Sequence, residues 1–161
     1  MKLYLMRHGP AEDHAGSGLD ADRALTSKGR DRVRDVAKCL MDAGEVPLHI
    51  VSSPLVRAVQ TAEVIAAVTS LSGREASLSI RRELALGVGG LALVKELRAT
   101  PMPRTMLVGH EPDMSAIATH LLEALLPLPF DKAMVVGLAL HADAAELRFV
   151  LDPIELRIER A

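Results

Sequence analysis

Two histidines and two arginines of this sequence lie close to the points where predicted buried strands end. Arg7 and His8 follow the first apolar run, Arg57 comes shortly after the second, and His110 follows a later one. Such side chains need partners, because burying an unpaired charge is costly. Guanidinium and imidazole groups suit phosphate oxygens, and a neutral imidazole can also attack phosphorus. The residue types therefore predict a site for a compact dianion such as phosphate.

Apolar runs and helical periodicities predict an alternation of strands and helices along the chain. Strands are expected at 3–7, 48–51, 78–80, 105–108, 133–140 and 146–151, and helices between 26 and 44, at 53–69, at 91–99 and at 113–125. This alternation predicts a three-layer α/β/α sandwich in which residues 1–161 form a single domain. The central sheet is expected to be mostly parallel, with an antiparallel edge formed by the last two strands.

The predicted fold brings the four residues together, because ligands of open α/β sheets bind outside the carboxyl ends of the strands. The helices that follow Ser53 and Pro112 would point their positive N-termini at the same edge. Ser53 is the expected cap of its helix, with Pro54 in the first helical position. Pro127 and Pro129 are expected to close the helix that follows Pro112.

Length, charge and cysteine content limit the possible classes of function. The chain has 161 residues, a net charge of −2 and one cysteine, which cannot form an internal disulfide. The charge argues against nucleic acid or an anionic membrane surface as a partner. No apolar stretch approaches the roughly 18 residues of a membrane helix. Because Arg7 and His8 interrupt the first apolar run, we expect no signal peptide and a cytoplasmic protein.

Taken together, the motifs resemble those of the histidine phosphatase superfamily, also called the phosphoglycerate-mutase-like or RHG family. The short chain and the Gly-His-Glu-Pro stretch resemble its small SixA-type branch, the phosphohistidine phosphatases, which lacks the helical insertions of larger relatives. The matching residues occur in the family's order over nearly the whole chain: Arg7-His8-Gly9, Leu25-Thr26 with Gly29, Ser52-Ser53-Pro54-Leu55, Arg57-Ala58, Gln60-Thr61-Ala62 and Gly109-His110.

The resemblance implies a role for each residue of the core site. His8 would be the nucleophile and would form a phosphohistidine enzyme, while Arg7, Arg57 and His110 would hold the phosphoryl oxygens. Gly9 would let the ligand approach the main chain. Splitting hydrolysis into two transfers gives two easier steps, and the scheme needs no metal or cofactor. The Gln60-Thr61 pair lies one turn into its helix, where simple packing is the expected role.

Glu83 is the candidate general acid, because family members that act on esters use a carboxyl group to protonate the leaving oxygen. Glu83 follows a predicted strand and precedes a glycine-rich turn, but its surroundings differ from the mutase-like pattern. The alternative is a solvated partner for Arg81 or Arg82. An imidazole leaves phosphorus far more readily than an alkoxide, so a phosphohistidine substrate needs no strong acid.

Three functions are compatible with these residues. The first is a phosphatase that acts on phosphohistidine in a signalling protein, such as a histidine-containing phosphotransfer domain. The second is a phosphomonoesterase for small sugar or nucleotide phosphates. The third is an inactive phosphate-binding module, against which the presence of all four core residues argues. A phosphohistidine phosphatase is our main prediction.

Overall fold

The computed structural model describes residues 1–126 and 129–161, and these form one seven-stranded sheet. The strands are β1 Lys2–Arg7, β2 His49–Ser52, β3 Ser77–Ile80, β4 Thr105–Gly109, β5 Val135–Leu140, β6 Ala145–Asp152 and β7 Arg157–Arg160. Their order is β3-β2-β4-β1-β5-β6-β7. The first four strands of this order run parallel, and β5, β6 and β7 continue the sheet in antiparallel fashion.

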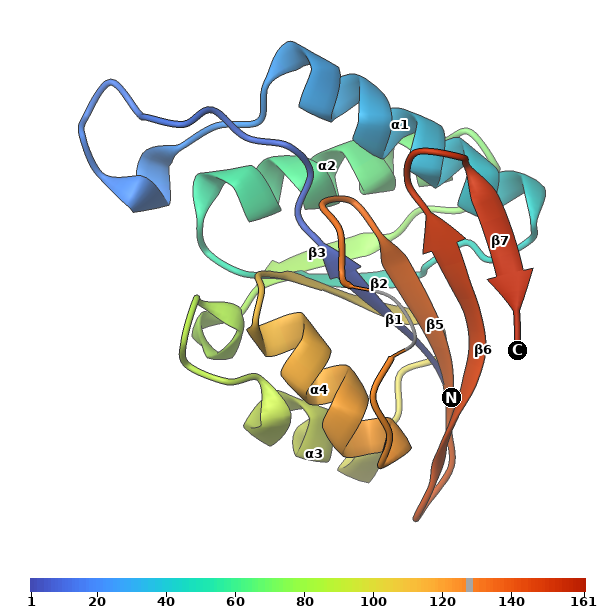
Figure 1. Cartoon of the computed structure of the whole chain (residues 1–161). Coiled ribbons are helices and arrows are strands. Elements are labelled where there is room, and N and C mark those ends of the chain that lie inside the picture. Colours follow the sequence, from blue (N-terminus) through green and yellow to red (C-terminus); the bar gives the residue numbers. More distant parts are fainter. Residues whose placement is uncertain (127–128) are drawn as a thin grey trace.

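Helices cover both faces of the sheet (Figure 1). They are α1 Ser27–Asp42, α2 Val56–Ser70, α3 Leu91–Ala99 and α4 Asp113–Leu122, with short 3-10 helices η1 Asp20–Asp22 and η2 Arg82–Leu84. Helices α1 and α2 lie on one face and α3 and α4 on the other. This arrangement confirms the predicted three-layer α/β/α sandwich.

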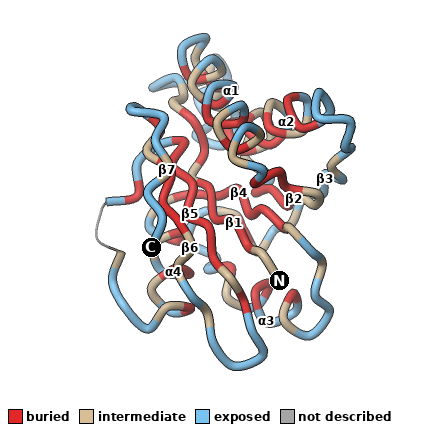
Figure 2. Tube along the Cα trace, turned by 90° about the vertical axis from the view of Figure 1, so that its right-hand side faces the viewer, coloured by how far each residue is buried: buried red, intermediate tan, exposed pale blue. Residues whose placement is uncertain are grey.

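Strand β1 has a core on each side, and its alternating side chains divide between the two. Leu3 and Leu5 belong to the apolar cluster shared with α3 and α4, whereas Tyr4 and Met6 belong to the cluster shared with α1 and α2. All four are fully buried, and the inner strands form the most buried part of the molecule (Figure 2). A strand covered on both faces is apolar throughout, which explains the continuous apolar run in the sequence.

The parallel register brings the ends of three strands to one level. Arg7 of β1 lies opposite Gly109 of β4, and Ser52 of β2 lies opposite Val108 of the same strand. The next residues continue the pairing, since the His8 amide donates to Gly109 O at 3.0 Å. The predicted meeting of these three junctions at one sheet edge is therefore confirmed.

Helix α1 begins and ends as the sequence predicts. Thr26 caps it by accepting a hydrogen bond from the Gly29 amide at 2.9 Å, and Gly44 follows its last turn with a φ of 71°. Gly29 also allows close contact with the preceding loop, because a Cβ there would lie 2.0 Å from Pro10 O. The backbone of residues 10 and 29 can approach this closely only without that side chain.

The predicted boundaries of the other two long helices need correction. Helix α2 begins at Val56, with Leu55 and not Ser53 at its N-cap, so Pro54 lies outside the helix. The Ser53 hydroxyl contacts His110 instead. Helix α4 ends at Leu122, because Glu123 adopts a left-handed conformation with a φ of 53°. It therefore stops before Pro129, and the expected stop at Pro127 lies outside the described residues.

Strand β7 is absent from the prediction, which ended the sheet with two antiparallel strands. It pairs with β6, with Leu151 opposite Ile158 and Phe149 opposite Arg160. Three of its four residues are charged, so it carries no apolar alternation by which a strand is recognised. Within the described part of the chain, no helix is both long and apolar enough to cross a membrane.

Candidate active site

The structure brings His8, Arg57 and His110 into one buried cluster at the carboxyl ends of the parallel strands. The ring centroids of the two histidines lie 5.1 Å apart. Arg57, in the first turn of α2, donates from Nε to His8 Nε2 at 3.3 Å. The exposed fractions of His8, Arg57 and His110 are 6%, 2% and 1%. Three of the four residues that were expected to converge at the carboxyl ends of the strands therefore lie together in the structure.

The hydrogen bonds of His8 define its tautomer. Its Nδ1 lies 2.7 Å from Gly9 O, and a carbonyl oxygen can only accept, so Nδ1 carries the hydrogen. The Nε2 lone pair accepts from Arg57. Burial lowers the pKa of His8 to about 3, with further contributions from His110, Arg57 and Arg7 and against the effect of the Gly9 contact. At neutral pH His8 is thus an uncharged imidazole with its lone pair on Nε2.

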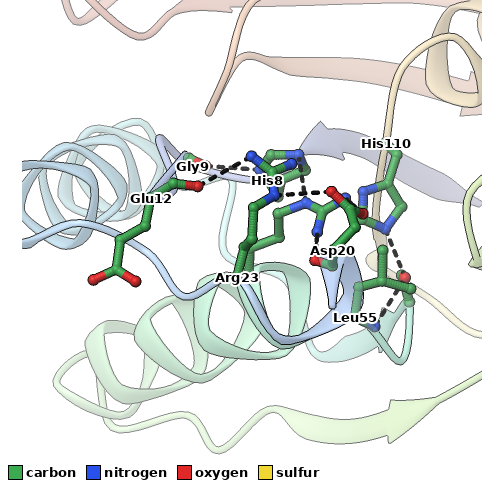
Figure 3. A network of polar contacts seen from close by, with 9 residues as sticks. His8, Gly9, Glu12, Asp20, Arg23, Leu55 and His110 are labelled. Atoms are coloured by element: carbon green, nitrogen blue, oxygen red, sulfur yellow. Dashed lines mark hydrogen bonds and ion pairs between the residues drawn. The ribbon is translucent and has the colours of Figure 1, made fainter. Parts of the chain in front are cut away.

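His110 is held from the α2 side by Ser53. The Ser53 hydroxyl accepts a hydrogen bond from the Leu55 amide at 3.3 Å and lies 2.7 Å from His110 Nε2 (Figure 3). We assign the hydroxyl hydrogen to the bond with Nε2, which leaves the imidazole hydrogen on Nδ1. Burial, followed by the charge of Arg57, lowers the pKa of His110 to about 4. His110 is therefore neutral and presents Nδ1 as a donor.

Two donors of this region are buried without a partner among the described residues. They are Arg7 Nε and His110 Nδ1. Arg7 donates from Nη1 to Phe130 O at 2.9 Å, and its charge contributes to the lowered pKa of both histidines. A buried donor without an acceptor costs about 1–3 kcal/mol. An anion that accepted a hydrogen bond from either group would remove its share of this cost.

Gln60 and Thr61 do more than the packing role predicted for them. The Thr61 Oγ1 accepts a hydrogen bond from the Gly9 amide at 3.0 Å, and Gln60 Oε1 accepts from the Leu25 amide at 2.8 Å. Gly9 immediately precedes the loop 10–25, and Leu25 is its last residue. Two consecutive side chains of α2 therefore fix both ends of that loop, a role that only the tertiary structure reveals.

Position 9 requires a glycine, because the packing around it leaves no room for a side chain. A Cβ at Gly9 would lie 2.5 Å from Cγ2 of Val33 in α1. The Gly9 amide is already bonded to Thr61, so a contact between this residue and phosphate stays a prediction.

Asp20 is the residue of the site that sequence reasoning missed. It lies in η1, within the loop 10–25, and its side chain converges with His8 and His110 in Figure 3. Its carboxylate accepts from Arg57 Nη2 at 3.1 Å, and its carbonyl oxygen accepts from Nη1 at 2.9 Å. The only signal in the sequence was its place in a polar loop of functional length after strand β1.

Glu83 lies in η2, which follows β3, and its carboxylate is occupied. It accepts from Arg81 Nη2 at 2.6 Å, and Arg81 also pairs with Glu96 at 2.7 Å. The hydrogen bond from Arg81 lowers the pKa of Glu83, which therefore carries no proton to donate at neutral pH. Its role as a general acid stays a prediction. Among residues 1–126 and 129–161, no three His, Cys, Asp or Glu side chains are grouped to hold a metal ion.

Sequence comparisons identify relatives of this chain. Residues 3–84, about half of the chain, match the family model described as the histidine phosphatase superfamily (branch 1). An uncharacterized protein from Picosynechococcus is 40% identical over 114 residues, which are 71% of this chain and 68% of that protein. The fold and this family match define a phosphatase. The chain belongs to the histidine phosphatase superfamily.

Solved structures agree with this assignment. The protein histidine phosphatase SixA in complex with tungstate superposes with a TM-score of 0.86 at 24% identity, over 98% of this chain and 100% of that one. A SixA from Agrobacterium tumefaciens gives a TM-score of 0.80 at 26% identity, over 94% and 98% of the two chains. A mycobacterial glucosyl-3-phosphoglycerate phosphatase superposes with a TM-score of 0.66 at 20% identity, over 91% of this chain and 96% of that one. The fold is of the SixA type.

Proposed function

We propose that this phosphatase removes the phosphoryl group from phosphohistidine in a protein, through a phospho-His8 intermediate. The observation that carries the choice of substrate is the state of Glu83, whose carboxylate is bound and ionised by Arg81. A phosphate ester needs a proton donor for its leaving alkoxide, whereas an imidazole leaves phosphorus with little help. The likeness to SixA structures supports the same substrate class.

In the first half of the proposed reaction, the lone pair of His8 Nε2 attacks phosphorus while the bond from phosphorus to the substrate nitrogen breaks. The leaving imidazole takes its proton from solvent and departs neutral. Arg7, Arg57 and His110 donate to the phosphoryl oxygens and offset the charge that develops on them. In the second half, water attacks the phosphorus of phospho-His8, which releases inorganic phosphate and restores the imidazole.

The site favours this attack before any substrate arrives. His8 is buried and uncharged, and its Nδ1–H bond to Gly9 O orients the ring so that Nε2 carries the lone pair. The same contact supports the positive charge that the ring gains when Nε2 bonds to phosphorus. Because Arg57 Nε already donates toward Nε2, its N–H has only to shift its acceptor from nitrogen to a phosphoryl oxygen.

A small phosphate ester is the second candidate substrate. The likeness to the glucosyl-3-phosphoglycerate phosphatase favours it, since the two chains share a fold. On this alternative, Glu83 would have to leave Arg81 and gain a proton before each turnover. Replacement of Glu83 by Gln therefore separates the two candidates: hydrolysis of an ester would fall at least about tenfold, and hydrolysis of phosphohistidine would change less than twofold.

The experiment that tests this function compares initial rates on a phosphohistidine-bearing carrier domain with rates on sugar, nucleotide and serine phosphates, all with a chelator present. His8→Ala is the blank, and His141→Ala, at an exposed histidine outside the cluster, is the matched control. We expect preference for the carrier domain and an acid-labile, alkali-stable phosphoenzyme that is lost in His8→Ala alone. A phosphoenzyme that persists in His8→Ala would refute the mechanism. A preference for one ester would favour the second candidate, and no turnover at all would indicate a binding module.

A further inference from the structure

Arg57 uses two different sides of its guanidinium group. A guanidinium offers one fork of donors between its two terminal nitrogens and another between Nε and a terminal nitrogen. Both terminal nitrogens donate to Asp20, Nη1 to the carbonyl oxygen at 2.9 Å and Nη2 to the carboxylate at 3.1 Å. Nε donates to His8 Nε2 at 3.3 Å. Asp20 therefore engages both terminal nitrogens of Arg57, while Nε faces His8.

Asp20 is itself fixed by a second arginine of the same loop. Arg23 Nε donates to Asp20 Oδ1 at 2.9 Å, and Arg23 Nη1 donates to Glu12 O at 3.0 Å (Figure 3). The two carboxylate oxygens thus serve different arginines, Oδ2 for Arg57 and Oδ1 for Arg23. A carboxylate with both oxygens engaged has little rotational freedom, so it holds Arg57 in one orientation.

Arg57 needs such a partner because it is buried. Only 3% of its side chain is exposed, compared with 59% for Asp20. A buried guanidinium without an anion is costly, and one with a free choice of partners adopts more than one rotamer. Although burial opposes it, contact with Arg57 and Arg23 lowers the pKa of Asp20, so that the counter-charge is present at neutral pH.

We propose that Asp20 is a positioning residue for Arg57: it holds the terminal nitrogens so that the fork containing Nε faces His8 Nε2 and receives the phosphoryl group. The loop 10–25 is thereby part of the phosphate site, although it supplies no group that touches phosphorus. The inference rests on the proposed role of Arg57 in phosphate binding and holds whichever phosphorylated substrate the enzyme uses.

A competing role for Asp20 would have the opposite effect. If the carboxylate occupied the place of a phosphoryl oxygen, its removal would strengthen the binding of oxyanions. The division of the guanidinium argues against this role, because Asp20 accepts from the two terminal nitrogens and leaves Nε to His8. The sign of the change in affinity therefore distinguishes positioning from competition.

The test measures tungstate binding to the full chain by titration calorimetry, together with the single-turnover rate of phosphoenzyme formation. The variants are Asp20→Ala, which removes the carboxylate, and Asp20→Asn, which keeps one acceptor oxygen and loses the charge. Asp22→Ala is the matched control, since Asp22 belongs to the same 3-10 helix and bonds to Ser17. Thermal melting of each variant reports whether the fold is intact.

We expect Asp20→Ala to weaken tungstate binding and slow phosphoenzyme formation, each by about tenfold, in a protein that still melts cooperatively but at a lower temperature, because the buried Arg57 loses its anion. Asp20→Asn should lie between Ala and wild type, and Asp22→Ala should match wild type. Unchanged or tighter tungstate binding in Asp20→Ala would overturn the proposal, and so would an equal loss in Asp22→Ala. A wild-type protein that binds tungstate but leaves phosphohistidine intact would refute only the proposed substrate. A wild type that binds no tungstate would refute the phosphate site and the positioning role together.

Discussion

The Gly9 amide donates a hydrogen bond to Thr61 Oγ1 at 3.0 Å, which ties the residue after His8 to helix α2. The same hydroxyl donates to Arg57 O at 2.7 Å, one turn earlier in that helix. Thr61 thus fixes the backbone on both sides of the His8–Arg57 contact. A buried side chain that contacts neither the imidazole of His8 nor the guanidinium of Arg57 thus connects the backbone segments that carry the two groups.

Replacement of Thr61 by Val tests this relationship, because the two side chains have nearly the same shape. The Gly9 amide would be left buried without an acceptor, and we expect the free energy of unfolding to fall by about 1–3 kcal/mol. The phosphatase rate should fall as well, since His8 and Arg57 lose their common anchor. Urea denaturation and initial rates measure the two effects. Thr61→Ser keeps the hydroxyl and should retain most of the stability and most of the phosphatase rate. Equal losses in Thr61→Ser and Thr61→Val would show that the methyl group matters instead of the hydroxyl.

The low pKa of His8 has a direct consequence for the pH dependence of the rate. With a pKa of about 3, His8 stays unprotonated throughout the range in which an ordinary histidine, with a pKa near 6.5, gains its proton. We therefore expect kcat/KM to show no acid limb near pH 6.5 from the nucleophile. A pH profile of kcat/KM from 4.5 to 8.5, corrected for the ionisation of the substrate's phosphoryl group at about pH 6, measures this. An acid limb near 6.5 that remains after this correction, and that persists when each of the other histidines is replaced, would contradict the expectation.

The stability of the fold should decrease at acidic pH because of the two buried histidines, whereas a salt-bridged histidine has the opposite effect. His8 and His110 have lower pKa values in the folded state, about 3 and about 4, than in the unfolded chain. Between these values and about 6.5 the unfolded state binds more protons, so the free energy of unfolding falls as the pH decreases. We expect a loss of about 2 kcal/mol per histidine between pH 7.5 and 5, measured by urea denaturation. His8→Asn should lose correspondingly less than wild type over that interval.

Glu45 is a buried carboxylate that is not part of the candidate active site, and its removal should lower the stability of the fold. It accepts from Tyr4 at 3.0 Å, Lys2 at 3.1 Å and Arg148 at 2.7 Å, and it is 3% exposed. Despite opposing burial, these partners, Arg148 first, lower its pKa to about 2. Glu45→Gln leaves the two cations without their anion, and we expect a loss of about 3 kcal/mol at pH 7.

The loss of stability caused by Glu45→Gln should also be smaller at acidic pH. A carboxylate with a lowered pKa stabilises the fold fully above its unfolded value near 4.5, and that contribution disappears as the pH falls toward 2. Denaturation of wild type and Glu45→Gln at pH 7 and pH 3 measures the difference. Glu63→Gln, at an exposed position of α2, provides the control and should change stability by less than about 0.5 kcal/mol. If Glu45→Gln lost the same amount of stability at pH 7 and at pH 3, the charge of Glu45 could not be the origin of that loss.

The sequence was enough to predict the elements that bring His8, Arg57 and His110 together. Apolar runs locate the parallel strands, and the rule that ligands bind at their carboxyl ends locates the cluster. The contacts that hold the cluster could not be predicted in this way. Ser53 had the type and position of a helix cap, and only the start of α2 at Val56 frees its hydroxyl for His110.

Asp20 illustrates a second limit. Nothing in a polar loop indicates which of its carboxylates folds back onto an arginine, because that choice depends on the path of the loop in space. Asp13, Asp20 and Asp22 have the same chemistry, yet the structure places Asp20 on Arg57 and pairs Asp22 with Ser17.

The charged strand β7 was missed for a related reason. Its residues form a strand because β6 offers an edge to pair with, and not because of their own sequence pattern.

The two neighbouring anchors on α2 leave only part of the loop 10–25 free to change. Thr61 holds the start of the loop, Gln60 holds its end, and the contact of Asp20 with Arg57 holds it in between. Exposed loop segments are the parts of a fold that tolerate insertion best. The exposed residues 16–19, which precede Asp20, are thus the place where a longer or shorter loop could alter substrate preference while Asp20 keeps its contact with Arg57.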